Sequence, residues 1–193
     1  MAYCTTAELK RYLNITGTSD DTLLGELIDA ATAMIDTATG TTFAVNSDTT
    51  RYLDAIGNVD GAYLLFDKWC AAITSITNGD GIAVESTDYV TEPRGDAPYY
   101  GVKIKSSKDV TWTYGDDEEN AIAVVGKWGY STTPPADVVQ ACKRLAAFLY
   151  RQRENANDVD RAVVVGNATV LPSQLPADVA KMLAPYKSLS GWL

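Results

Sequence analysis

The densest group of ionisable side chains is the segment Asp116-Asp117-Glu118-Glu119. Adjacent carboxylates can bind Ca²⁺, which takes several oxygen ligands, and a pair such as Asp116 and Glu119 could act as acid and base in a hydrolase. The ligand spacing of an EF-hand is missing, however, and such a segment between two predicted strands is typical of a loop that faces water. We interpret it as a solvated loop, with the calcium site and the hydrolase as alternatives.

The sequence contains no histidine. Ser-His and Cys-His nucleophile arrangements are therefore excluded, as is the commonest general base and metal ligand. No P-loop or G-x-S-x-G motif occurs, and Gly79-Asp80-Gly81 lacks the third glycine of a dinucleotide-binding fingerprint. We expect no catalytic residues, no cofactor and no metal, and predict that the protein is not an enzyme.

Cys4, Cys70 and Cys142 are odd in number and widely spaced, with no C-x-x-C motif. This pattern argues against a disulfide framework and against a zinc site. Cys142 falls within an apolar helical pattern, which is typical of a small core residue.

The 16 Lys and Arg residues stand against 25 Asp and Glu, for a formal net charge of -9. An acidic chain does not hold nucleic acid through a broad phosphate-neutralising face. The charge favours solubility, and the alternative is an acidic surface past which DNA slides. The basic residues around one predicted helix end suit the helix dipole or, alternatively, an acidic partner: Lys143, Arg144, Arg151, Arg153 and Arg161.

No apolar segment approaches the roughly 18 residues that a membrane helix needs, and the first residues, Met-Ala-Tyr-Cys-Thr-Thr, do not resemble a secretory signal. We therefore expect a protein made in a cytoplasm, with no membrane partner.

Helical patterns occupy both ends of the chain. Thr5 and Glu8 have the spacing of a capping box, and Asp20 is expected to cap a second helix that ends at Gly40. Its apolar positions recur at helical spacing: Leu24, Leu27, Ile28, Ala31, Ile35 and Ala38. After Pro134-Pro135 a third helix is predicted, with its apolar face formed by Val138, Ala141, Cys142, Leu145, Phe148 and Leu149.

The middle of the chain is rich in β-branched and aromatic residues that alternate with turn signals. Asn78-Gly79-Asp80-Gly81 is a strong hairpin turn signal. The candidate strands are Thr50–Asp54, Tyr63–Asp67, Ala71–Thr77, Ile82–Val90, Tyr100–Lys105, Val110–Thr113 and Ala121–Lys127.

The predicted fold class is α+β. Residues 1–41 and 131–193 are expected to form an α-helical bundle, and residues 42–130 an inserted small antiparallel β sandwich or barrel.

A last short helix is predicted to begin at Pro176, and the chain then ends on an apolar Trp192-Leu193. Chain ends are usually polar and frayed, whereas aromatic anchors are common at interface hot spots. The apolar side of this helix is either core or interface. The predicted partner-binding segment contains Leu175, Val179, Met182, Leu183, Tyr186, Trp192 and Leu193.

Three segments together carry a resemblance to a known family. They are TTAELKRYLNITGTSDDTLLGELIDAATAMIDTATGTTF (Thr5 to Phe43), GKWGYSTTPPADVVQACKRLAAFLYRQRE (Gly126 to Glu154) and LPADVAKMLAPYK (Leu175 to Lys187). In order and spacing they resemble the head–tail connector family of tailed phages, also called adaptor or head-completion proteins. The resemblance covers both helical ends and matches the β segment only in outline.

This resemblance implies a structural protein of the virion neck, made in the host cytoplasm. Members form a ring, commonly of twelve, beneath the portal protein. The ring extends a channel through which DNA passes without specific binding, and it docks a tail-side neck or tail-completion protein. Carried onto this chain, Leu175 to Leu193 would face the portal. An alternative is a tail-completion or decoration protein that binds through its β module. A version in a gene-transfer particle would have the same physical role.

Overall fold

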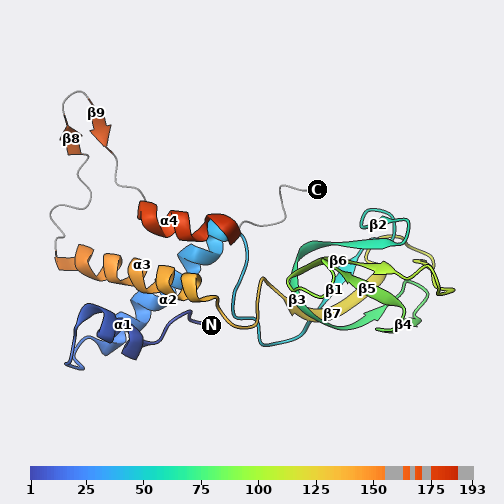
Figure 1. The fold of residues 1–193 in the computed structure, drawn as a ribbon, viewed down its shortest axis with the longest axis horizontal. Helices are drawn as coiled ribbons and strands as arrows, with labels where there is room; N and C mark the ends of the chain where they lie inside the picture. The colour runs from blue at the N-terminus through green and yellow to red at the C-terminus, as the bar shows by residue number, and fades with distance from the viewer. Residues whose placement is uncertain (155–162, 166–167, 171–174, 187–193) are drawn as a thin grey trace. The chain divides into compact units, whose positions relative to one another are not determined.

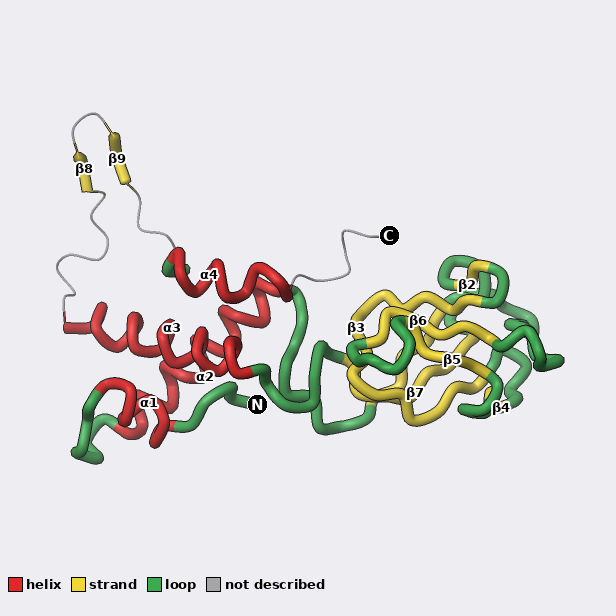
Figure 2. Tube along the Cα trace, viewed as in Figure 1, coloured by secondary structure: helices red, strands yellow, loops and turns green. Residues whose placement is uncertain are grey.

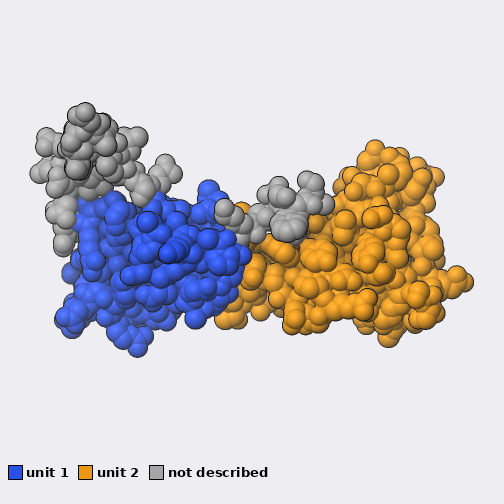
Figure 3. Space-filling model, turned by 45° about the horizontal axis from the view of Figure 1, so that its top comes forward, with its two compact units in different colours: residues 1–39, 134–187 blue, residues 40–133, 188–193 orange. Residues whose placement is uncertain are grey.

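The structure, a computed structural model, describes residues 1–154, 163–165, 168–170 and 175–186. The described residues fall into two compact units (Figure 3). The helical unit contains Met1–Thr39 and Pro134–Lys187, and the β unit contains Gly40–Thr133. The units therefore divide at 39/40 and 133/134, whereas the sequence places the boundaries at 41/42 and 130/131. The fold class is α+β, with the long helices and the large sheet in different units (Figure 2).

Helix α1 (Thr6–Leu13) begins with the predicted capping box. The Thr5 hydroxyl accepts a hydrogen bond from the Glu8 N–H at 3.2 Å, and the Glu8 carboxylate accepts one from the Thr5 N–H at 2.8 Å. Two N–H groups that would otherwise lack partners at a helix start are thereby satisfied. Asn14 ends the helix in the left-handed conformation, with φ of 60°.

Helix α2 (Asp21–Thr39) buries one stripe of side chains, formed by Leu24, Ile28, Ala31, Thr32, Ile35 and Thr39. Most of the predicted apolar face is thus buried, although Leu27 is half-buried and Ala38 is exposed. The predicted stop is confirmed at Gly40, whose φ of 66° is one that glycine adopts without strain.

The start of α2 is fixed by contacts of two aspartate side chains. Asp20 lies directly before the helix, and its carboxylate accepts a hydrogen bond from the Tyr150 hydroxyl at 2.6 Å. Asp21 pairs with the Lys10 ammonium of α1 at 2.7 Å. The two carboxylates therefore link α2 to its neighbours, whereas the sequence predicted only that they cap the helix.

Helix α3 (Ala136–Glu154) contacts α1, α2 and α4 (Ala177–Leu183), as Figure 1 shows. Its buried residues are Val138, Ala141, Cys142, Leu145, Ala146 and Ala147, while the predicted Phe148 and Leu149 are half-buried. A 3-10 turn, η1 (Ala184–Tyr186), continues α4. Between α3 and α4 in sequence, β8 (Val163–Val165) pairs antiparallel with β9 (Ala168–Val170).

The β unit contains seven antiparallel strands: β1 (Thr49–Leu53), β2 (Val59–Asp60), β3 (Tyr63–Thr77), β4 (Ala83–Val84), β5 (Tyr89–Glu92), β6 (Tyr99–Ile104) and β7 (Ile122–Trp128). Their order is β1-β7-β3-β6-β5, with β2 and β4 also paired to β3. The sheet is open, because β1 and β5 end it. The barrel that the sequence offered as one alternative is therefore not closed, and all seven strands belong to one sheet.

Strand β3 joins what the sequence predicted as two strands. Its pairing with β6 changes register between Leu65 and Cys70, and its pairing with β7 changes register after Cys70 and again after Ile73. Such irregularities bend a strand and increase its twist. Residues from both halves of β3, among them Leu64 and Ile76, consequently belong to one buried cluster.

Two glycines allow the neighbouring strands to approach this bent strand. A Cβ atom at Gly126 of β7 would lie 2.5 Å from the Ala72 carbonyl oxygen, and one at Gly101 of β6 would lie 2.6 Å from the Leu64 carbonyl oxygen. Side chains larger than hydrogen are therefore excluded at both positions. The core beside them includes Phe66 and Trp128, whose rings meet edge to face with centroids 5.1 Å apart.

The predicted strand Val110–Thr113 is wrong, because this segment has no regular strand structure. The predicted turn after β3 is confirmed: the Asn78 N–H donates to the Ile82 carbonyl at 2.8 Å, and the chain returns as β4. The buried Asn78 side chain then holds the 111–113 segment through the Thr111 carbonyl, at 2.8 Å, and the Thr113 N–H, at 3.0 Å.

Candidate partner-binding surface

Helix α4 is fixed to the helical unit by its apolar side. Val179 is fully buried and Leu183 is 4% exposed, and the helix contacts both α3 and α2. These two predicted interface residues therefore stabilise the unit itself, since burying such a side chain contributes about 1.5–3 kcal/mol. In this structure, both side chains face the core of the helical unit.

Polar contacts hold the two ends of this segment. The Arg144 guanidinium of α3 pairs with the Asp178 carboxylate at 2.7 Å. At the far end, the Tyr186 hydroxyl lies 2.7 and 2.6 Å from the two carboxylate oxygens of Asp137 and donates its hydrogen to that carboxylate. The predicted site residue Tyr186 is thus fixed in orientation, and its ring remains half-buried.

An open groove of about 330 Å³ lies beside Leu175, which is separated from the start of α4 by Pro176. Its lining consists of Ala33, Met34, Thr37 and Ala38 of α2 together with Leu175. Leu175 and Met182 are half-buried. The structure therefore leaves Leu175, Met182 and Tyr186 accessible, while the predicted anchors Trp192 and Leu193 lie outside the described residues.

Two of the described basic residues of α3 are paired with carboxylates of other segments. Lys143 pairs with Glu8 at 3.5 Å, and Arg144 pairs with Asp178. Arg151 is exposed, whereas the Arg153 side chain and the whole of Arg161 lie outside what the structure describes. Sequence reasoning could not identify these ion pairs, because their partners come from distant segments.

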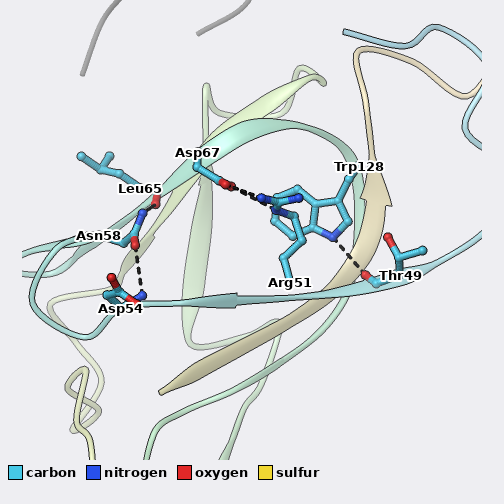
Figure 4. A network of polar contacts seen from close by, with 7 residues as sticks. All are labelled: Thr49, Arg51, Asp54, Asn58, Leu65, Asp67 and Trp128. Atoms are coloured by element: carbon cyan, nitrogen blue, oxygen red, sulfur yellow. Dashed lines mark hydrogen bonds and ion pairs between the residues drawn. The ribbon is translucent and has the colours of Figure 1, made fainter. Parts of the chain in front are cut away.

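In the β unit, a network of polar contacts links the edge strand β1 to its neighbours in the sheet (Figure 4). Arg51 of β1 donates from Nε to Asp67 of β3 at 3.0 Å, and its second nitrogen bonds the other carboxylate oxygen. The guanidinium carbon lies 5.5 Å from the ring centroid of Trp128, whose indole N–H donates to the Thr49 carbonyl at 3.0 Å. Arrangements of this kind stabilise a strand edge and carry no reaction.

The acidic segment 116–119 is mainly exposed. Its backbone is held by the Ala55 N–H, which donates to the Glu118 carbonyl at 2.8 Å. Among the residues that the structure describes, no group of three or more potential ligands is placed to hold a metal ion. Within the same residues, no helix is both long enough and apolar enough to cross a membrane.

Solved structures with a similar fold come from gene transfer agent (GTA) particles. A chain from the neck of an empty GTA particle, computed with C6 symmetry, aligns over 96% of this chain and 89% of its own, with 16% identity and a TM-score of 0.57. A chain from the neck of a native GTA particle, computed with C12 symmetry, aligns over 94% and 87%, with 16% identity and a TM-score of 0.56. A chain from the virion of a native gene transfer agent particle aligns over 96% of this chain and 89% of its own, with 17% identity and a TM-score of 0.55. At these identities, the likeness establishes the fold.

No curated protein matches the sequence. The family model of head completion proteins, in contrast, matches residues 2–189, which is nearly the whole chain and includes both units. The protein therefore belongs to the family of head completion proteins.

Proposed function

We propose that this head completion protein is a structural adaptor of a phage-like particle, located in the neck between the portal of the head and the tail. The observation that carries the proposal is the family match over residues 2–189. The fold likeness to chains of GTA necks supports it. A neck adaptor needs complementary surfaces and catalyses no reaction. The absence of histidine from the sequence is consistent with such a role.

The adaptor would act as one subunit of a closed ring around a DNA channel. The C6 and C12 symmetry of the similar neck structures supports such an arrangement. A ring forms when each subunit contacts the next in the same head-to-tail way and the repeated rotation adds up to a full turn. Because the many contacts of a ring act together, each one can be weak. Residues 40–133 contain 14 Asp and Glu against 7 Lys and Arg. Repeated around a ring, this excess would repel the DNA backbone and let it pass without binding.

The portal-facing element in this proposal is the segment that begins at Leu175. Helix α4 supplies a base fixed by Val179, Leu183 and the Arg144–Asp178 ion pair. Leu175, Met182 and Tyr186 remain accessible on this base, and Trp192-Leu193 follows in sequence as an aromatic anchor of the kind found at interface hot spots.

A short truncation tests this assignment. Deleting residues 188–193 removes Trp192 and Leu193 but keeps α4, whereas a deletion from Leu175 would also remove two core side chains and confuse docking with folding. The truncated protein and the full chain are each added to an extract that lacks the adaptor, and the yield of joined heads and tails is measured. We expect this yield to be at least about ten-fold lower with the truncated protein than with the full chain. The far-UV circular dichroism of the truncated protein should be unchanged. Tyr114→Ala, which removes an exposed aromatic ring of the β unit, is the matched control.

If the truncated protein joins heads to tails normally, the docking role of this segment is wrong. A pull-down then distinguishes the alternative of a tail-completion or decoration protein, which the separate core of the β unit favours. The adaptor should retain purified portal protein. A protein that binds through its β unit to the tail would retain tail tube and not portal.

A further inference from the structure

Two of the three cysteines, 138 positions apart in sequence, meet inside the helical unit. The Sγ atoms of Cys4 and Cys142 are 3.6 Å apart. Cys4 is 5% exposed and Cys142 is fully buried. Both are free thiols. The wide sequence spacing gave no sign of this pair, because only the packing of the N-terminal segment against α3 brings the two sulfurs together.

The surroundings of the pair hold the sulfurs in contact. Cys4 lies between Tyr3 and the capping residue Thr5, and the Tyr3 hydroxyl bonds the Asp36 carboxylate of α2. The hydroxyl oxygen of Thr32 in α2 lies 3.8 Å from the Cys142 sulfur. Three segments therefore converge on the two thiols: the N-terminal residues, α2 and α3.

We propose that Cys4 and Cys142 form a redox-sensitive pair that a low-molecular-weight disulfide oxidises to an intramolecular disulfide. The two sulfurs need to approach by a little over 1.5 Å to reach the length of a disulfide bond. A bond at this place would link the N-terminal segment covalently to α3. The proposal does not depend on the adaptor role, because it concerns the isolated chain.

The reaction balances with the small disulfide as oxidant. Local opening of the N-terminal segment brings Cys4 to solvent, where its thiolate attacks one sulfur of the small disulfide and releases one small thiol. The Cys142 thiolate then attacks the Cys4 sulfur of this mixed disulfide and releases the second small thiol. The two protein thiol protons end on the two released thiols, and the protein loses two hydrogen atoms.

The electrostatics of the pair favour Cys142 as the second nucleophile. In the closed form, hydrogen bonding with Cys4 and then with Thr32 lowers the pKa of the Cys142 thiol, whereas hydrogen bonding with Cys142 and burial raise the pKa of the Cys4 thiol. Once Cys4 has become a mixed disulfide it has no S–H left, and the Thr32 hydroxyl remains beside the Cys142 sulfur to stabilise its thiolate. Cys70 is different: it is buried in the β unit, and burial raises the pKa of its thiol to about 11. It therefore serves as an internal control that should stay reduced.

The test compares full-length protein incubated with dithiothreitol or with oxidised glutathione. Intact mass under denaturing conditions should fall by the mass of two hydrogen atoms, and peptide mapping after alkylation should identify a Cys4–Cys142 link with Cys70 alkylated. Because the closed loop is long, the thermal unfolding midpoint of the helical unit should rise by about 5 °C or more. Cys70→Ser should behave as the natural sequence does, and Cys142→Ser should lose both effects.

Three results would overturn the proposal: all three thiols remaining reduced, a glutathione adduct on Cys4 that persists without closing, or a link that involves Cys70. If Cys142→Ser does not fold, Cys4→Ser gives the same test at a position outside any helix.

Discussion

The side chain of Asn78 connects three backbone groups inside the β unit. Its amide oxygen accepts from the Gly79 N–H at 3.1 Å and from the Thr113 N–H at 3.0 Å, and its amide nitrogen donates to the Thr111 carbonyl at 2.8 Å. Asn78 is 5% exposed, so water cannot easily replace these bonds. A buried group that loses its partner costs more than the bond itself contributed.

Asn78→Ala should therefore lower the free energy of unfolding of the β unit by about 2–4 kcal/mol. The measurement is urea unfolding followed by tryptophan fluorescence, because Trp69, Trp112 and Trp128 all lie in this unit. The matched control is Ser107→Ala in an exposed turn, which should change the value by less than about 0.5 kcal/mol. Equal stability of the two variants would show that the Asn78 bonds do not support the fold.

Two glycine substitutions should have opposite effects. Gly126→Ala places a Cβ 2.5 Å from a backbone oxygen of β3, and overpacking of this kind costs about 1–3 kcal/mol. Gly25 lies within α2, and apart from the adjacent backbone of its own helix no atom lies within 4 Å of an added Cβ, so Gly25→Ala should stabilise the helical unit by about 0.5–1 kcal/mol. Tryptophan fluorescence reports the first change and circular dichroism the second. A stabilising Gly126→Ala would contradict the close approach of β7 to β3.

Asp36 should make the helical unit more stable in acid than an ordinary aspartate would. Burial raises the pKa of its carboxyl, although the hydrogen bond from Tyr3 opposes this. A carboxyl whose pKa is raised in the folded state disfavours folding when it is ionised, and this cost disappears as the pH falls through the raised pKa. Asp36→Asn keeps an acceptor for Tyr3 and removes the charge. Its unfolding free energy at pH 7 should equal or exceed that of the natural sequence, with a difference that shrinks toward pH 4; a clear loss at pH 7 would contradict the account.

At the scale of elements, the capping box fixes where α1 begins. Hydrogen bonds from Thr5 lower the pKa of the Glu8 carboxyl. Its stabilising effect is therefore present above the ordinary glutamate pKa and is lost as the pH falls through the lowered value. Thr5→Ala should cost about 1 kcal/mol at pH 7, measured by circular dichroism, and less at pH 3. A cost that is independent of pH would show that the Thr5 hydroxyl supports only the Glu8 N–H and not the Glu8 carboxylate.

The elements that follow local rules could be predicted from sequence. The Thr5–Glu8 spacing, the Gly40 stop and the turn at Asn78 act within a few residues, and all three are confirmed. Val110–Thr113 has β-branched residues but is not a strand, because Asn78 bonds its backbone. The continuous β3 was predicted as two strands, because its irregular pairing breaks the alternation that a regular strand has.

The sequence could not show which of the predicted partner-binding residues are buried in the protein's own core. One helical face looks the same in sequence whether it meets a partner or the protein's own core, and packing against α3 and α2 decided the case for Val179 and Leu183. The Arg144–Asp178 and Lys143–Glu8 ion pairs and the Cys4–Cys142 contact join segments that are distant in sequence. No local pattern contains that information.

At the scale of the whole molecule, the β unit has the features of an insertion that folds by itself. Its two ends are joined, since the Tyr130 N–H donates to the Thr42 carbonyl at 2.7 Å and the Ser131 hydroxyl donates to the Phe43 carbonyl at 3.1 Å. Its core is its own. We therefore expect the isolated segment Gly40–Thr133 to unfold cooperatively in urea, monitored by tryptophan fluorescence. A gradual, non-cooperative change would show that it needs the helical unit.

The adaptor account requires this protein to assemble on a portal. The most direct measurement is native mass spectrometry of the protein alone and after mixing with the purified portal protein of the same particle. The account predicts a new species in which several copies of the chain are bound to the portal ring, and the species should be lost when residues 188–193 are deleted. Protein that stays unbound beside an intact portal would contradict it.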